Sequence, residues 1–288
     1  MSLIFFFFVF FIFFSTFIDK TLSSHFRGGT ISWAPVNPSV SFPVASVPVE
    51  VTMRFFWNIA FNWGSPSSCT GTNCCNSAAA VTASKLFGDS TNLNSQNGPF
   101  WSLSSQANCY AYSTTNAWSA QKRTQTQSII TTSQVTAMWS NSAWITGVVN
   151  INMTSYWYLS VVFNLAQRAD TGKINTSPVT SMVPYVIISS NCTNNRSVTI
   201  PVTDADGDVV RCICKYNLCI ANAFMDENNC VLYFNPTVTG YYAIEIEIQD
   251  FATASSTTPL STVPLVFLVS VVNSGATCCS DGTNNCRK

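Results

Sequence analysis

A two-residue alternation of apolar and polar side chains recurs along this chain of 288 residues. It is clearest at residues 49–57, where Val, Val, Met, Phe and Trp occupy the odd positions. Successive side chains of a β-strand point to opposite faces, so this alternation predicts a strand with one buried face. Residues 124–139, 144–152 and 156–164 repeat the pattern and are rich in Thr, Val, Ile and aromatic residues. Because helix signals are nearly absent, we expect an all-β fold.

The amino terminus is a long apolar run. Its first charged residues are Asp19 and Lys20, and a small-residue exit follows at residues 23–24. This pattern is typical of a secretory signal peptide, which we place at residues 1–24. The apolar core is shorter than the about 20 residues of a membrane helix, and no Lys or Arg precedes it. We expect a secreted, extracellular protein, with an uncleaved signal anchor at the cell surface as the alternative.

All 12 cysteines follow this leader, which fits an oxidising compartment in which most of them form disulfides. Zinc ligation is the alternative for the closely spaced pairs, but no histidine lies near them. Spacing alone does not fix the connectivity. The cysteines form three groups, namely Cys69, Cys74, Cys75 and Cys109; Cys192, Cys212, Cys214, Cys219 and Cys230; and Cys278, Cys279 and Cys286.

Charge divides the chain into two unequal halves. Residues 25–190 carry three acidic and seven basic side chains, whereas residues 191–288 carry nine and five. Pro and small polar residues at 176–184 favour an extended connection between the halves. Neither half contains a basic run, so nucleic acid is not an expected partner. We predict an N-terminal β-sandwich with cysteine-containing loops at residues 25–182, a second, disulfide-linked β-sandwich at 183–273 and a cysteine-containing tail at 274–288.

The run TDADGD at residues 203–208 places three carboxylates at alternate positions between two strand-like segments. Ca²⁺ takes oxygen ligands from closely spaced carboxylates, and a glycine lets the backbone turn tightly between them. We therefore expect Asp204, Asp206 and Asp208, joined by Asp250, to bind Ca²⁺, with no other cofactor. The alternative is a plain turn, in which an Asp side chain accepts hydrogen bonds from backbone groups two residues on. The EF-hand pattern is not matched, because Gly207 stands fourth rather than sixth.

Residues 183–272 resemble the cadherin-like and related Ig-like modules of secreted and cell-surface proteins. The resemblance rests on DADGD between two strands, on VLYFNP at residues 231–236, and on TGYY at 239–242 before a long strand that closes on Asp250. It implies Ca²⁺ ligation at a module edge by the acids already named. The chain departs from cadherins in its five cysteines within one module and in lacking a tandem array.

The opening HFRGGTISW at residues 25–33, combined with this module, resembles a group of animal extracellular proteins of uncharacterised function. That resemblance spans nearly the whole mature chain and implies no activity. Sequons for N-linked glycans support an extracellular location. They predict glycosylation at Asn152, Asn175, Asn191 and Asn195.

Catalysis is not expected. His25 is the only histidine, so a catalytic triad or a His-based zinc site would rest on one residue. Carboxylate pairs suited to a glycosidase, Asp204 with Glu227 or Glu245 with Glu247, are the formal alternative. However, Glu245 and Glu247 occupy the outward positions predicted for a strand. The expected function is that of an interaction or structural protein of matrix or adhesion type, with an extracellular protein or glycan as its partner.

The alternative function is carbohydrate binding through aromatic side chains of the first half. Aromatic rings stack on the apolar faces of sugars, but they also fill the cores of β-sandwiches. We favour the core interpretation, since residues 135–139 alternate as buried positions should. The tryptophans concerned are Trp101, Trp118, Trp139, Trp144 and Trp157.

Overall fold

The structure is a computed structural model, and its described residues form fifteen strands and no helix. The predicted all-β fold is therefore confirmed. Within these residues no helix is long and apolar enough to cross a membrane. The predicted leader at residues 1–24 and the tail at 274–288 lie outside them. The described residues are 26–58, 108–113, 115–130, 134–141, 144–151, 156–183, 185–190, 196–215, 223–236 and 238–273.

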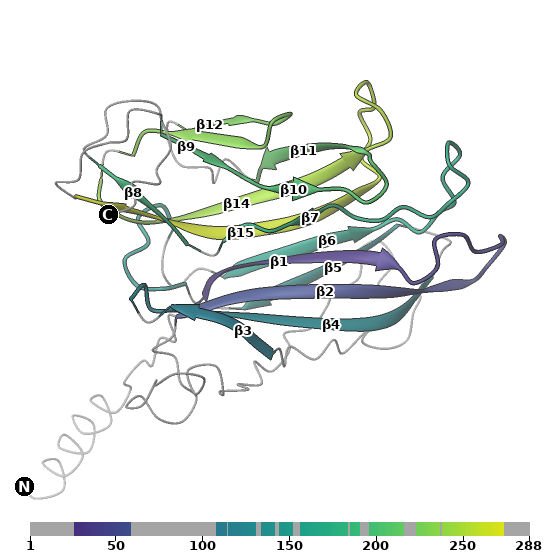
Figure 1. Cartoon of the computed structure of the whole chain (residues 1–288), viewed down its shortest axis with the longest axis horizontal. Coiled ribbons are helices and arrows are strands. Elements are labelled where there is room, and N and C mark those ends of the chain that lie inside the picture. The colour runs from purple at the N-terminus through teal and green to yellow at the C-terminus, as the bar shows by residue number, and fades with distance from the viewer. Residues whose placement is uncertain are drawn as a thin grey trace, which may run out of the picture.

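One large sheet runs through the molecule in the order β11-β14-β15-β1-β2-β4-β3 (Figure 1). Three further strands join it, because β6 and β8 both pair with β15 and β5 pairs with β6. The strands of this sheet are β1 (Phe26–Pro35), β2 (Ser46–Asn58), β3 (Asn108–Ser113), β4 (Trp118–Ile130), β5 (Val135–Asn141), β6 (Trp157–Phe163), β8 (Tyr185–Ser189), β11 (Val209–Cys214), β14 (Gly240–Phe251) and β15 (Ser261–Val272).

Two smaller sheets complete the described fold. A three-stranded sheet has the order β12 (Ala223–Asp226), β13 (Val231–Phe234) and β9 (Arg196–Thr199). A two-stranded sheet pairs β7 (Val179–Thr180) with β10 (Val202–Thr203). The strand β10 is short and leads directly into the acidic run.

The first half of the chain builds its core between β1–β2 and β5–β6. Phe55 of β2 meets Trp139 of β5 with ring centroids 5.5 Å apart, and Trp33 of β1 meets Phe163 of β6 at 5.3 Å. The odd positions of β2 from 47 to 55 are buried, Trp57 is partly buried, and most of the even positions are not buried, as the alternation predicts. Burial of Trp139, Trp144 and Trp157 confirms the core interpretation of these three rings and removes them from any sugar-binding surface.

The second half is tied by a disulfide between two sheets. Cys212 in β11 is bonded to Cys230, which directly precedes β13, and Cys214 is disulfide-bonded too. In β14 the isoleucines at 244, 246 and 248 are buried, as predicted. The prediction that Glu245 points outward is wrong, since only 5% of this residue is exposed. The strand β14 lies inside the sheet between β11 and β15, and residues 242–246 are buried on both of its faces.

The strand β15 joins the two predicted domains into one sheet. One edge of β15 pairs with β14 along most of its length. Its other edge pairs in turn with β6 at Thr262, with β1 at Leu265 and Val266, and with β8 from Leu268 onward. Figure 1 shows β1–β5 on one side of β15 and β14, β11 and β12 on the other. The predicted border between residues 182 and 183 therefore does not separate two sheets. The sequence could not show this, because alternation predicts strands but not their pairing partners.

Two glycines bring β1 close to its neighbours. Gly28 has a φ of 144° at an irregularity in the pairing of β1 with β2. A Cβ atom on Gly28 would lie 2.1 Å from the carbonyl oxygen of Val266 in β15. A Cβ on Gly29 would lie 2.7 Å from the carbonyl oxygen of Arg54 in β2. The FRGGT motif thus supplies the close approach by which β1 enters the sheet.

Candidate functional site

The acidic run connects β10 to β11 through a tight turn closed by one of its own carboxylates. The Oδ1 atom of Asp204 accepts hydrogen bonds from the backbone N–H groups of Asp206, at 2.9 Å, and Asp208, at 3.1 Å. Gly207 adopts a φ of 76°, a conformation that glycine reaches without steric cost. This local geometry matches the plain turn that the sequence offered as the alternative to a Ca²⁺ site.

A guanidinium from the first half of the chain pairs with these acids. Arg168 donates from Nη1 and Nη2 to the two carboxylate oxygens of Asp208, and from Nε and Nη2 to Asp170. Its Nη1 also lies 3.8 Å from Oδ2 of Asp206. The side chains of Arg168 and Asp208 are each only 5% exposed. Hydrogen bonds to Asp170 and Asp208 raise the pKa of Arg168 further above its usual range, so this cation stays charged.

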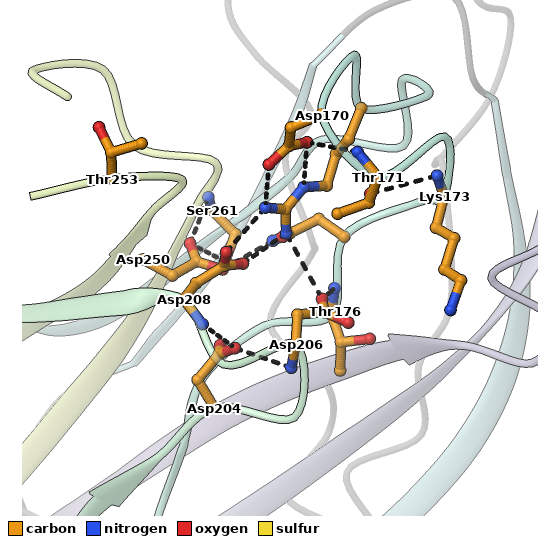
Figure 2. A network of polar contacts seen from close by, with 12 residues as sticks. Asp170, Thr171, Lys173, Thr176, Asp204, Asp206, Asp208, Asp250, Thr253 and Ser261 are labelled. Atoms are coloured by element: carbon orange, nitrogen blue, oxygen red, sulfur yellow. Dashed lines mark hydrogen bonds and ion pairs between the residues drawn. The ribbon is translucent and has the colours of Figure 1, made fainter.

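Behind Arg168 the network continues to the end of β14. Oδ1 of Asn175 accepts a hydrogen bond from Arg168 at 2.9 Å, and Nδ2 of Asn175 donates to Oδ2 of Asp250 at 2.7 Å. The other oxygen of Asp250 accepts from the backbone N–H and the hydroxyl of Ser261. Burial raises the pKa of Asp250 to about 6, although its hydrogen bonds with Asn175 and Ser261 act in the opposite direction. Figure 2 shows Asp250 and Ser261 beside the acidic turn.

The structure brings together three of the four predicted metal ligands. Carboxylate oxygens of Asp204, Asp206 and Asp208 lie within 4.8 Å of one another, whereas both oxygens of Asp250 are engaged elsewhere. Within the described chain, Oδ2 of Asp204 is buried without a hydrogen-bond partner, and burial raises the pKa of this carboxyl.

The carboxylate oxygens of the acidic run are arranged to accept hydrogen bonds from a guanidinium rather than to bind Ca²⁺. Both oxygens of Asp208 already accept from Arg168, and Oδ2 of Asp206 accepts from the backbone N–H of Thr176 at 2.6 Å. A calcium ion needs roughly six to eight oxygen ligands. It would therefore have to displace Arg168, which itself supplies the positive charge that the acidic run requires.

Sequence reasoning missed Arg168, Asn175 and Ser261. Arg168 lies 40 residues from Asp208, and no local motif connects them. The opposite charge balance of the two halves was the one available signal for this pairing, because an acidic cluster in one half is stabilised by a basic side chain from the other.

The predicted glycan at Asn175 needs correction. This side chain is 1% exposed, and the nitrogen that would carry a glycan donates to Asp250 instead. Ser177 of the same sequon is also buried, and its hydroxyl oxygen accepts from the backbone N–H of Trp33. The predicted sites at Asn152, Asn191 and Asn195 lie outside the described residues.

The remaining candidates do not form a reactive centre among the described residues. Glu247 pairs with Lys215 at 3.1 Å, and burial raises the pKa of Glu245 to about 7. Glu227 is exposed, and its backbone oxygen accepts from the N–H of Cys212. Trp118 is partly exposed. The predictions that fall outside the described residues, or on side chains that are not described, concern His25, Trp101, Cys69, Cys74, Cys75, Cys109, Cys192, Cys219, Cys278, Cys279 and Cys286.

Curated proteins similar to this chain include integrin beta-like proteins of Dictyostelium discoideum. Integrin beta-like protein A is 32% identical over 149 residues, which cover 47% of the chain. Protein C is 25% identical over 243 residues, 80% of the chain, and protein B is 23% identical over 245 residues, 82% of the chain. The chain spans between 7% and 11% of the length of these relatives.

No family model matches the chain. No solved structure matches it either. The resemblance to cadherin-like and Ig-like modules therefore gains no support from these comparisons, and the similarity they find is to integrin beta-like proteins instead.

Proposed function

We propose that the chain is an extracellular adhesion-type protein, secreted or held at the cell surface, that binds a partner without catalysing a reaction. The observation that carries this proposal is the similarity to an integrin beta-like protein across 80% of the chain. The all-β fold, the disulfide between Cys212 and Cys230 and the apolar leader support it. A function without catalysis is supported by Asp208 and Asp250, whose carboxylates are held in buried hydrogen bonds.

An exposed tyrosine pair supports a protein-binding surface on the first half. Tyr156 and Tyr158 are 59% and 43% exposed, and their ring centroids lie 6.5 Å apart at the start of β6. Tyrosine is enriched in interfaces because it combines a large contact area with a polar hydroxyl. We assign the partner contact to this face of β6.

A bead-attachment assay tests the proposal. Beads coated with the secreted chain should attach to cells or to matrix-coated surfaces more than beads coated with the reduced, unfolded chain. Replacing Tyr156 and Tyr158 by Ser should lower attachment at least about tenfold. A matched control replaces Phe224, an exposed aromatic residue of β12, and should retain attachment. Equal attachment of folded and unfolded coatings contradicts the proposal, and loss with simple sugars as competitors favours the carbohydrate-binding alternative.

Calcium binding at the acidic run stays a prediction from the sequence, and Arg168 argues against it. Thermal melts in Ca²⁺ and in chelator decide whether Ca²⁺ or the Arg168 guanidinium neutralises the acidic run. If the acids bind Ca²⁺, the melting midpoint should rise with Ca²⁺ and the rise should vanish in the double variant Asp206→Asn, Asp208→Asn. An unchanged midpoint means that Arg168 alone neutralises the run.

A further inference from the structure

Arg27 is a buried cation at the junction of the two halves of the chain. It lies in β1 beside the irregularity at Gly28, and only 4% of the residue is exposed. Its guanidinium carbon lies 5.5 Å from the ring centroid of Tyr185 in β8 and 5.9 Å from that of Tyr241 in β14. The two rings lie 6.1 Å apart, so one side chain of the first half packs against a pair of rings of the second.

This guanidinium has no acceptor among the described residues. Its Nε and Nη1 atoms are buried without a hydrogen-bond partner. The other two buried arginines of the described chain are both satisfied, since Arg168 pairs with carboxylates and Arg196 donates to the carbonyl oxygens of Ser190 and Pro236. Leaving a buried charged donor without an acceptor is costly. Buried donors of this kind in folded proteins commonly indicate a bound ion or water.

The two tyrosines do not supply the missing negative charge. Their ring faces attract the cation, but ring faces leave N–H groups in the guanidinium plane without acceptors. Burial raises the pKa of Tyr185, whose hydroxyl also interacts with Ser270 and Tyr241, so the phenol stays neutral at physiological pH. Burial lowers the pKa of Arg27, yet a guanidinium starts from so high a value that it remains charged.

We propose that the buried Arg27, which packs against Tyr185 and Tyr241, is a binding site for one small inorganic anion of the size of chloride. The anion accepts hydrogen bonds from Nε and Nη1 and neutralises the buried charge. Its size is limited because Arg27 is almost fully enclosed, which excludes a carboxylate presented by another protein. Bound there, the anion ties β1 to β8 and β14. This proposal is independent of the adhesion function.

Thermal unfolding of the whole secreted chain tests the site. The melting midpoint is measured in sodium chloride mixed with sodium gluconate at constant ionic strength, because gluconate is too large to enter. We expect the midpoint to rise by about 5 °C and to saturate as chloride replaces gluconate. The variant Arg27→Gln should show no such dependence. Arg211→Gln is the matched control, since Arg211 donates to the carbonyl oxygens of Ala254 and Ser256, and it should keep the dependence.

A second measurement on the wild-type chain covers the case in which Arg27→Gln does not fold. Crystals grown in bromide should show one anomalous scatterer within hydrogen-bond distance of the Arg27 guanidinium. Water alone at that position would overturn the proposal. Equal melting in chloride and gluconate, or an unchanged chloride effect in a folded Arg27→Gln variant, would overturn it as well, since the acceptor would then be water or another group of the chain.

Discussion

Arg168 is the residue on which the acidic site depends. Its guanidinium fork matches the carboxylate of Asp208, and the pairing is almost completely removed from solvent. The acidic turn itself could be predicted from six consecutive residues, because Asp and Gly fold such turns locally. Arg168 could not, because its approach depends on tertiary packing of a segment 40 residues earlier.

Removing the Arg168 guanidinium should leave Asp208 buried and unpaired. We expect Arg168→Gln to lower the free energy of unfolding by about 3 kcal/mol, measured by chemical denaturation. Lys173→Gln, at an exposed position of the same loop, should change it by less than about 0.5 kcal/mol. The double variant Arg168→Gln, Asp208→Asn should recover at least about 1 kcal/mol relative to additivity. Strict additivity would show that the pair makes no coupled contribution.

Asn175 should carry no glycan in the folded protein. Its amide nitrogen donates to Asp250 inside the structure, and the side chain is buried so completely that a sugar on that nitrogen has no room. Peptide mass spectrometry of the secreted chain should find Asn175 unmodified. The variant Asn175→Gln should leave the glycan content unchanged while lowering the melting midpoint by several degrees, since the longer amide does not fit between Arg168 and Asp250. A glycosylated Asn175 in the folded chain would contradict this geometry.

At the level of elements, alternation predicted strands but not their neighbours. The period-two pattern of β2 and the isoleucine row of β14 appear as predicted. The pairing of β1 with β15 could not be anticipated, because these strands lie at opposite ends of the sequence. Glu245 was misplaced for a related reason: alternation shows which residues of a strand share a face, but not whether another part of the chain covers that face.

The entry of β1 into the sheet requires Gly28. A methyl group at this position would overlap the backbone of β15, which cannot move as a flexible side chain could. We expect Gly28→Ala to lower the free energy of unfolding by about 3 kcal/mol or more. Gly207→Ala is the control, because Gly207 has a positive φ but open space around it, and it should cost about 1 kcal/mol. Equal losses in calorimetry would show that backbone conformation alone, not crowding, selects Gly28.

The strand β14 makes stability depend on pH through two buried acids. Burial raises the pKa of Glu245 from 4.5 to about 7 and that of Asp250 from 3.8 to about 6. At a pH between the ordinary and the raised pKa of each group, the folded chain binds more protons than the unfolded chain. Acidification therefore stabilises the fold. Raising the pH from about 5 to about 7.5 should lower the free energy of unfolding by about 3 kcal/mol. Denaturant melts across this range should show a smaller slope for Glu245→Gln, and an increase in stability with pH would refute the assignment.

For the whole molecule, the opposite charge balance of the two halves reflects contacts between them rather than a division into separate domains. Arg168 of the first half meets Asp208 of the second, and Arg27 packs against Tyr185 and Tyr241. The chain should therefore unfold as one unit. Calorimetry of the secreted protein is expected to show a single transition whose calorimetric and van't Hoff enthalpies agree. Two resolved transitions would restore the division near residue 183.

The shared strand β15 has a mechanical consequence. Its backbone is hydrogen-bonded to β6 and β1 near its beginning and to β8 near its end, with β14 along the opposite edge. Tension between the halves therefore loads these rows of hydrogen bonds together with the chain segment that connects β6 to β8. That segment is itself held to the second half, because Arg168 pairs with Asp208 and Asn175 donates to Asp250. A fold built this way should transmit a pull as one stiff body.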